Sequence, residues 1–258
     1  PVPEAARPPE PNFWIAPPFS LPAHAGSNRT HWDLRYDAPP SPNHTFEINA
    51  NPGLTPPSPL GPLAVPGTYT LKLSVDGKSY TETVNVRADP RSPASASALQ
   101  SQHAIQMKIV DGIRQSYEGW RLASDLRSAL LASVPSGAAQ QMADLVAATT
   151  LYSARLDTVG GLDTTRARGR GAQSSAPNFR AINRSLVGLL NAQETGDMAP
   201  TPSMLAAYTK TCTDLATTIT AWQSLASTNL TELNAILTRR KIKVLAAPTS
   251  ALKPPTCS

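Results

Sequence analysis

Residue types that catalyse reactions or bind metal ions occur in this sequence, but their spacing matches no common chemical motif. The four histidines, His24, His31, His44 and His103, do not cluster along the chain. His103 falls on the inward side of an amphipathic segment, where packing or capping is the expected role. The motifs HExxH, CxxC, GxGxxG and GxSxG and the P-loop are all absent from the sequence. The sequence therefore predicts no catalytic residue, no cofactor and no metal site.

Three carboxylates near the start of the chain, Asp33, Asp37 and Glu47, come closest to an acid–base pair. A glycosidase needs two carboxyl groups that flank the bond to be cleaved. Asp33 stands two residues before Arg35 among aromatic, strand-like residues, so we expect it to pair with Arg35 or with a turn amide. The chain is therefore predicted not to be an enzyme.

A basic segment in the second half of the chain is the candidate for binding polyanions. Arg166, Arg168 and Arg170 lie in the polar stretch 162–178, and arginine recognises phosphate and carboxylate groups through paired hydrogen bonds. The alternative is a solvated loop without a ligand. The net charge of +5 permits contact with an acidic surface but does not require nucleic acid, and no nucleic-acid partner is expected.

The two cysteines, Cys212 and Cys257, are candidates for a disulfide bond. Cys212 lies about 29 residues before the end of the last predicted helix, roughly 43 Å along its axis. The tail from Lys243 to Cys257 spans roughly 50 Å when extended, so it can return along the helix and reach Cys212. A disulfide would fit an oxidising compartment. The alternative is two free thiols, one buried and one exposed.

The composition favours an exported protein. Charged residues make up 16% of the chain, against about 25% in an average soluble protein. No run of about 18 apolar residues occurs, so no transmembrane helix is expected. The chain starts at Pro1, inside a proline-rich stretch, without an initiating Met or a signal peptide. We therefore expect a secreted, periplasmic or cell-surface protein, with Pro1 as a candidate processing site.

A β-hairpin over residues 67–86 is the clearest element in the sequence. Asp76-Gly77 forms a two-residue turn signal, because these residues tolerate positive φ. Polar and apolar residues alternate before the turn, as in a strand with one apolar face. The polar residues are Thr68, Thr70, Lys72 and Ser74, and the apolar residues are Tyr69, Leu71, Leu73 and Val75.

The chain before the hairpin is proline-rich and extended. Residues 1–25 contain aromatic side chains, Phe13 and Trp14 among them, and we interpret them as a lead that docks on a neighbouring polypeptide. Residues 27–36 are predicted to form a strand, with Trp32 and Tyr36 on the same face. These four aromatic residues are the predicted docking residues.

The chain after the hairpin is predicted to be helical from residue 91 to residue 245. Hydrophobic residues recur there at steps of three and four, which is typical of amphipathic helices. The first helix is predicted to begin near Ser95 to Ser97, with Ser as its N-cap, and to end near Ser133.

The remaining helices are marked by glycine and proline. Gly160-Gly161 is predicted to end a second helix, a short third helix follows, and Thr201-Pro202 opens a fourth. Four helices of alternating direction imply an antiparallel bundle. Residues 246–258 are predicted to form an extended tail.

Several segments together resemble the C-terminal region of exported bacterial β-propeller proteins with sortilin-type or Asp-box (BNR) repeats, often labelled glycosyl hydrolases. Residues 26–36, GSNRTHWDLRY, are similar to the G-x-N-R-x-x-W-D-L-R-Y strand of that family, and residues 66–69, PGTY, to its P-G-x-Y hairpin. Residues 89–91, DPR, stand at the same junction. Residues 178–183, NFRAIN, resemble a further segment of that family. Arg180 stands in this chain where the family segment has a proline.

The resemblance implies an α+β fold, a partial immunoglobulin-like β-sandwich over residues 26–90 followed by the antiparallel four-helix bundle over residues 91–245. The propeller and the early sandwich strands of the family are absent from the sequence. A partner, either the propeller part of the same precursor or a larger complex, is then expected to supply the missing strands; the alternative is a replacement strand from residues 13–21. The implied function is a non-catalytic structural and protein-interaction module. The alternatives are an accessory part of a sialidase-like glycoside hydrolase, or a glycan- or polyanion-binding module.

Overall fold

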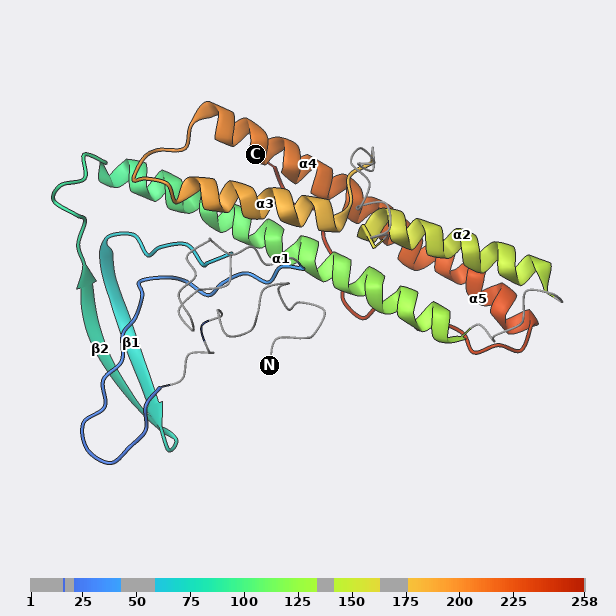
Figure 1. Cartoon of the computed structure of the whole chain (residues 1–258), viewed down its shortest axis with the longest axis horizontal. Coiled ribbons are helices and arrows are strands. Elements are labelled where there is room, and N and C mark those ends of the chain that lie inside the picture. Colours follow the sequence, from blue (N-terminus) through green and yellow to red (C-terminus); the bar gives the residue numbers. More distant parts are fainter. Residues whose placement is uncertain (1–15, 17–20, 43–58, 134–141, 163–175, 258) are drawn as a thin grey trace. The chain divides into compact units, whose positions relative to one another are not determined.

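The computed structural model describes residues 16, 21–42, 59–133, 142–162 and 176–257. This part of the chain is mostly helical, with a single two-stranded sheet (Figure 1). The elements are β1 (Gly67–Val75), β2 (Lys78–Val86), α1 (Ala96–Ser133), α2 (Ala143–Gly160), α3 (Phe179–Gln193), α4 (Pro202–Ser224), the π-helical segment η5 (Leu225–Asn229) and α5 (Leu230–Arg239).

The chain divides into two compact units, and each is described by itself. Unit 1 comprises Pro1–Pro39, Asn43–Val110 and Gly188–Leu205, and unit 2 comprises Pro40–Pro42, Asp111–Val187 and Ala206–Ser258. The division passes through α1, α3 and α4, so these helices contribute residues to both units. The sheet belongs to unit 1, and most of the buried helical core belongs to unit 2.

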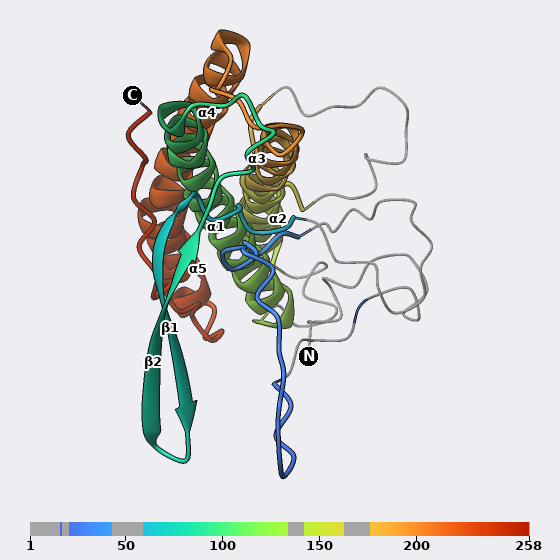
Figure 2. The ribbon, with the colours of Figure 1, turned by 90° about the vertical axis from the view of Figure 1, so that its left-hand side faces the viewer.

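The hairpin in unit 1 confirms the predicted strands and turn (Figure 2). Strands β1 and β2 pair antiparallel from Gly67↔Val86 to Val75↔Lys78. Asp76 and Gly77 between them have φ of 48° and 78°, the positive values that two-residue hairpin turns require. Because partners in an antiparallel pair share a face, the pairing Leu73↔Tyr80 lies on the apolar side of the sheet.

The predicted immunoglobulin-like sandwich is wrong. The described residues hold only the two strands of the hairpin and one isolated bridge, Arg35↔Leu63. Within residues 27–36 the alternation of residue types is that of a strand, but Leu34 has a φ of 60°, which interrupts an extended backbone. The predicted short strand over residues 45–48 lies outside the described residues.

Unit 2 is held together by apolar side chains from every helix. The rings of Phe179 and Trp222 meet edge to face, with centroids 6.5 Å apart, a favourable geometry for aromatic pairs. Gly119 in α1 lets α1 and α3 approach closely, because a Cβ at this position would lie 2.5 Å from the ring of Phe179 in α3. The fully buried residues of this core include Ile113, Ala123, Leu145, Leu156, Phe179, Leu215, Ile219 and Leu237.

The predicted helix ends of the sequence are confirmed by their caps. Ser95 caps α1 by accepting from the backbone N–H of Ala98 at 3.1 Å, and α1 ends at Ser133. Gly161 ends α2 in the left-handed conformation, with φ of 69°. Thr201 caps α4 by accepting from the N–H of Met204, and Pro202 occupies the first helical position.

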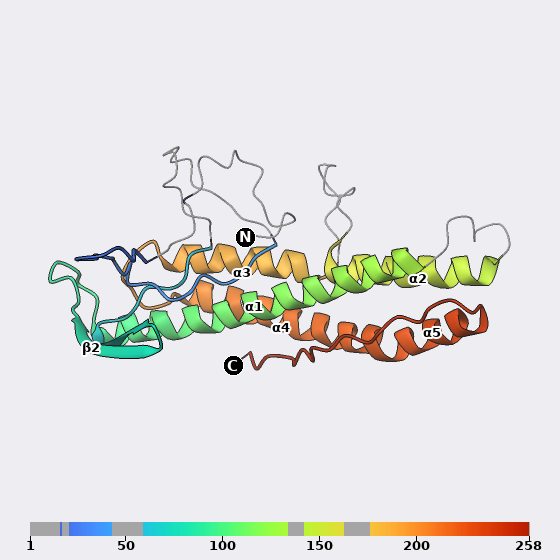
Figure 3. The same cartoon turned by 90° about the horizontal axis from the view of Figure 1, so that it is seen from below.

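The helix directions in unit 2 differ from the predicted alternation. Helix α2 and the start of α3 follow one another in the same direction, opposite to that of α1, and α4–η5–α5 returns in the direction of α1 (Figures 1 and 3). The connection between Gly160 and Phe179 is long in sequence, and a long connection does not force neighbouring helices to be antiparallel.

A π-helical turn, Leu225–Asn229, joins α4 to α5. The hydroxyl of Tyr152 donates to the carbonyl oxygen of Leu225 at 3.1 Å. Such turns widen the helix by one residue, and the buried series steps from Leu225 to Leu230 across it. The wider turn keeps the apolar side chains of both helices on the core side.

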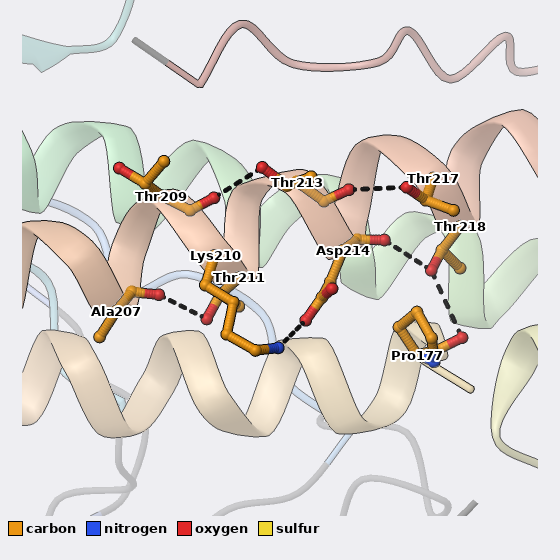
Figure 4. A network of polar contacts seen from close by, with 9 residues as sticks. All are labelled: Pro177, Ala207, Thr209, Lys210, Thr211, Thr213, Asp214, Thr217 and Thr218. Atoms are coloured by element: carbon orange, nitrogen blue, oxygen red, sulfur yellow. Dashed lines mark hydrogen bonds and ion pairs between the residues drawn. The ribbon is translucent and has the colours of Figure 1, made fainter. Parts of the chain in front are cut away.

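Helix α4 is rich in threonine, and the hydroxyls bond to its own backbone (Figure 4). Thr213 donates to the carbonyl of Thr209 at 2.9 Å and Thr217 to that of Thr213 at 3.0 Å. Thr218 donates to the carbonyl of Asp214 at 2.8 Å and also contacts the carbonyl of Pro177 at 3.4 Å. These hydroxyls therefore serve the helix and its packing.

The C-terminal tail returns along α5 and α4 (Figure 3). The side-chain amide of Asn234 holds the backbone of Leu245 through two hydrogen bonds of 2.9 Å, and Gln223 donates to the carbonyl of Leu252 at 2.8 Å. A disulfide joins Cys212 to Cys257 across 45 residues. The side chains of Leu245 and Leu252 are buried, so the tail is part of the core of unit 2.

Two glycine substitutions test the close packing at Gly119. We expect Gly119→Ala to lower the free energy of unfolding by about 1–3 kcal/mol, because the added methyl group overpacks the buried Phe179 ring. Gly188 in α3 is the matched control, because nothing lies within 4 Å of its added Cβ, and Gly188→Ala should stabilise by about 0.5–1 kcal/mol. Urea denaturation measures both changes, and a shift of the same sign in the two variants would contradict the packing argument.

Removing the disulfide tests the contribution of the tail. The Cys212→Ser, Cys257→Ser double variant should lose about 2–4 kcal/mol of unfolding free energy, because the bond closes a long loop in the unfolded chain. Thermal unfolding with and without a reducing agent measures the loss. The reducing agent should lower the midpoint of the parent protein and leave that of the double variant unchanged; equal midpoints for the oxidised parent and the variant would show that the bond adds no stability.

Candidate functional site: the hairpin surface

The apolar face of the hairpin is exposed at its tip. Leu71, Leu73, Val75 and Tyr80 are each between 46% and 56% exposed, and Tyr69 near the base is half-buried. Apolar side chains on one face of a sheet are normally covered by another layer. Within the described residues no other strand pairs with either strand, so the hairpin also presents two open edges.

Aromatic residues from the segment before the hairpin extend this apolar face. The ring of Trp32 packs edge-on against Tyr69, with centroids 5.5 Å apart, and its Nε1 donates to the carbonyl of Arg35 at 3.1 Å. Trp32 and Tyr36 are 38% and 40% exposed. We define the hairpin surface as the exposed residues Trp32, Leu34, Tyr36, Leu63, Leu71, Leu73, Val75 and Tyr80.

The hairpin surface contains two of the four predicted docking residues. The structure brings Trp32 and Tyr36 to the base of the hairpin through backbone hydrogen bonds: Tyr36 N–H donates to the carbonyl of Pro62 and Ala64 N–H to that of Leu34. The other two, Phe13 and Trp14, lie outside the described residues.

Of the other candidate residues, the structure describes Asp33, Cys212 and Cys257. Arg166, Arg168 and Arg170 lie in a segment that the structure does not describe. Asp33 accepts from the backbone N–H of Arg35 at 3.0 Å, which is the turn-amide pairing that the sequence suggested. Cys212 and Cys257 form the disulfide of unit 2.

A cavity of about 220 Å³ lies at the base of the hairpin in unit 1. Leu34 and Leu63 of the hairpin surface line it, together with the end of β2 and the first turns of α1. Its polar and charged lining residues are Arg87, Asp89, Gln102, His103, Gln106, Gln193, Glu194 and Asp197.

Some polar residues of this cavity connect different segments of unit 1. Arg35 pairs with Glu194 at 2.6 Å and donates to the carbonyl of Gly61 at 2.7 Å. Gln102 donates to the carbonyl of Gly196 at 2.8 Å and to that of Gln193. Asp89 is paired with Arg91, which holds the pKa of its carboxyl below the usual value. The contacts of Arg35 and Gln102 therefore form a structural network that joins residues 35, 61, 102, 193, 194 and 196 in unit 1.

His103 is the least satisfied group of the cavity. Its ring packs on Tyr36, with centroids 5.2 Å apart, and its Nδ1 is buried without a hydrogen-bond partner. Burial lowers the pKa of His103, and a bond with the backbone of Leu63 opposes this effect. The neutral ring is therefore the form that suits the fold.

The described part of the chain contains neither a cluster of metal-ligating residues nor a helix that could span a membrane. Its His, Cys, Asp and Glu residues include no group of three that could hold a metal ion. None of its helices is long and apolar enough to cross a membrane, as the sequence predicted.

Comparisons with known proteins add no functional assignment. No protein-family model, no curated protein and no solved structure matches this chain. The hairpin surface is consequently interpreted from its own chemistry.

The cavity was not predicted from the sequence, because its lining comes from five separate segments. From the sequence we expected an apolar face left uncovered by an incomplete sandwich, with the missing strands supplied by a partner, and that sandwich is wrong. The only sequence signal for exposure was the proximity of Lys78 and Glu82 to Tyr80 on the same side of β2, since charges rarely lie in a sheet core.

The burial of His103 predicts a pH dependence of stability. An unfolded histidine has a pKa of about 6.5, and the folded value is lower. Below pH 6.5 the unfolded chain therefore takes up a proton first, so the unfolding free energy should fall as the pH falls, until the folded pKa is reached.

Urea denaturation between pH 8 and pH 5 measures this dependence, with His103→Gln as the control. The parent protein should lose more stability than the control over this range. Parallel pH profiles for the two proteins would contradict the assignment to His103.

Proposed function

We propose that this chain is a non-catalytic structural module that binds another polypeptide through the hairpin surface. The observation that carries the proposal is the set of exposed apolar side chains on one face of a two-stranded sheet. A contiguous exposed apolar patch of this kind marks an interaction site, and a two-stranded hairpin without a covering layer is of marginal stability.

The energetics favour a covered hairpin. Burying one large apolar side chain contributes about 1.5–3 kcal/mol, and the tip exposes Leu71, Leu73, Val75 and Tyr80. Tryptophan and tyrosine are the residues that most often dominate binding energy at protein interfaces, and Trp32, Tyr36 and Tyr80 supply three of them at one surface.

The parent protein that we propose is an exported bacterial protein similar to the sortilin-type propeller proteins. The support is the resemblance of residues 26–36 and 66–69 to that family, and these two segments lie beside the hairpin surface. The disulfide fits an oxidising compartment. With no sandwich to complete, the proposed partner covers the apolar face; the propeller part of the precursor is one such partner.

A non-catalytic role agrees with the chemistry of the described residues. The hydroxyls of α4 bond to their own helix, the carboxylates of the cavity are largely paired with arginine, and His103 bonds to a backbone group. In this proposal the chain acts by burying apolar surface against a partner and not by catalysing a reaction.

A pair of hairpin variants tests the proposed function. Leu73→Ser with Tyr80→Ser removes two facing side chains of the apolar face, and we expect binding to the partner polypeptide to weaken at least about tenfold. Lys72→Ser with Thr81→Ser is the matched control, because this neighbouring cross-strand pair lies on the opposite face. Co-purification with chains from the native source, followed by affinity measurement on the isolated pair, provides the readout.

The outcomes separate the proposal from a general loss of folding. Both variants should keep the helical circular dichroism of the parent, because the substituted side chains are exposed. The proposal would be contradicted if neither variant lost affinity, or if the control lost as much affinity as the apolar variant.

A further inference from the structure

The side chains at the exposed tip of the hairpin are arranged in a regular pattern of apolar and charged residues. Three cross-strand pairs share the apolar face: Val75↔Lys78, Leu73↔Tyr80 and Leu71↔Glu82. Along β1 the three residues are all aliphatic. Along β2 a basic and an acidic residue stand on either side of Tyr80. We define these six residues as the tip patch.

A twofold axis across the centre of the tip patch maps it onto a complementary surface. The axis lies between two hairpins whose apolar faces are turned toward each other. It runs perpendicular to the strands, at the level of the Leu73↔Tyr80 pair. Strand β1 of one chain therefore covers β1 of the other, and β2 covers β2, with the strands running in opposite directions. Glu82 of the second hairpin then lies opposite Lys78, and its Lys78 lies opposite Glu82. Val75 meets Leu71, Leu73 meets Leu73, and Tyr80 meets Tyr80. Every aliphatic residue thus meets an apolar residue, and every charge meets its opposite.

We propose that the polypeptide bound by the tip patch is a second copy of this chain, packed hairpin on hairpin about this axis. The inference rests on the proposed function, because it names the partner of the same surface. In a twofold interface each contact occurs twice, so one self-complementary patch supplies two ion pairs and a continuous apolar centre. Two sheets packed in this way lie about 10 Å apart, the ordinary spacing of stacked sheets.

The residue types favour this partner over other ways of pairing two hairpins. The opposite face of the hairpin consists of hydroxyl and amide side chains with Lys72 as its one charge, so two such faces would contain no ion pair and little apolar surface. Pairing two β2 edges in one sheet leaves the apolar faces of both hairpins uncovered. Only the face-to-face arrangement of the apolar sides buries the exposed leucines and neutralises both charges.

The charged residues of the tip patch also select one direction of pairing. Charges at the rim of an interface set register and partner choice more than affinity. Lys78 and Glu82 border the apolar residues of the tip patch and are exposed in the single chain. A twofold axis along the strands would instead place Lys78 against Val75 and Glu82 against Leu71, so each charge would be buried against an aliphatic side chain without an opposite charge.

Sedimentation of the purified full chain with charge-reversal variants tests the proposal. We expect the parent chain to form a reversible dimer. Lys78→Glu alone and Glu82→Lys alone should each raise the dissociation constant at least about tenfold, because each replaces two attractive contacts with two repulsive ones.

Restoring the charge pairs provides the decisive comparison. An equimolar mixture of the two single variants should form a heterodimer with the affinity of the parent, since the new glutamate at position 78 of one chain faces the new lysine at position 82 of the other. The Lys78→Glu, Glu82→Lys double variant should dimerise like the parent, because both of its ion pairs are simply inverted. Failure of both rescues would overturn the proposed axis.

Two further variants separate the face from the edge and from other surfaces. Leu73→Lys should abolish the dimer in the face-to-face arrangement, whereas a dimer through the β2 edge would retain it. Lys72→Glu, on the opposite face, should leave the dimer unchanged. A dimer that survives Leu73→Lys would place the contact elsewhere and overturn the inference.

The proposed function and this inference can fail separately. A parent chain that stays monomeric up to about 100 μM, which means an association free energy weaker than about 5.5 kcal/mol, overturns the second copy as partner. Loss of binding to a different chain in the Leu73→Ser, Tyr80→Ser variant would then still support the proposed function. A monomer whose hairpin variants change no binding at all would overturn both.

Discussion

The register between β1 and β2 is the constraint on which the exposed chemistry of unit 1 depends. It is set by Asp76-Gly77, whose two positive φ angles close a turn of only two residues. A slip of one residue would exchange the two faces of one strand, and leucine and tyrosine would then mix with threonine. The division between an apolar face and a hydroxyl-rich face therefore follows from a single turn.

The parts of the fold that local sequence determines were predictable. The hairpin follows from strict alternation and a turn dipeptide, and the helix ends follow from Ser95, Gly161 and Thr201, each acting within a few residues of its own position. The sandwich was not predictable in this way, because it depends on pairing between distant strands. The alternation over residues 27–36 suggested a strand, yet the backbone turns at Leu34 and only Arg35 forms a bridge. Helix direction failed for a related reason, since the long connection after Gly160 carries no directional information.

The candidate site was predictable to a smaller extent. Trp32 and Tyr36 were identified as docking residues because they share a face in the sequence pattern, and the structure places both at the base of the hairpin, exposed. The sequence predicted an uncovered apolar face only through the strands missing from a sandwich, and the structure contains no such sandwich. Alternation alone identifies the apolar face of Leu71, Leu73 and Val75 but not what covers it. The cavity beside His103 is lined by five segments, and proximity between distant segments leaves no periodic signal.

The bond between Cys212 and Cys257 also decides how this chain would carry a mechanical load. A pull applied at Cys257 passes through the sulfur atoms to Cys212 in the middle of α4. The second half of α4, the π-helical turn, α5 and the returning tail would all remain slack while the bond is intact. The residues between the two cysteines, which stand 45 positions apart, form a length of chain that is hidden from tension and released only by reduction. A chain held at both ends would therefore lengthen in two stages, and its redox environment would set whether the second stage is available.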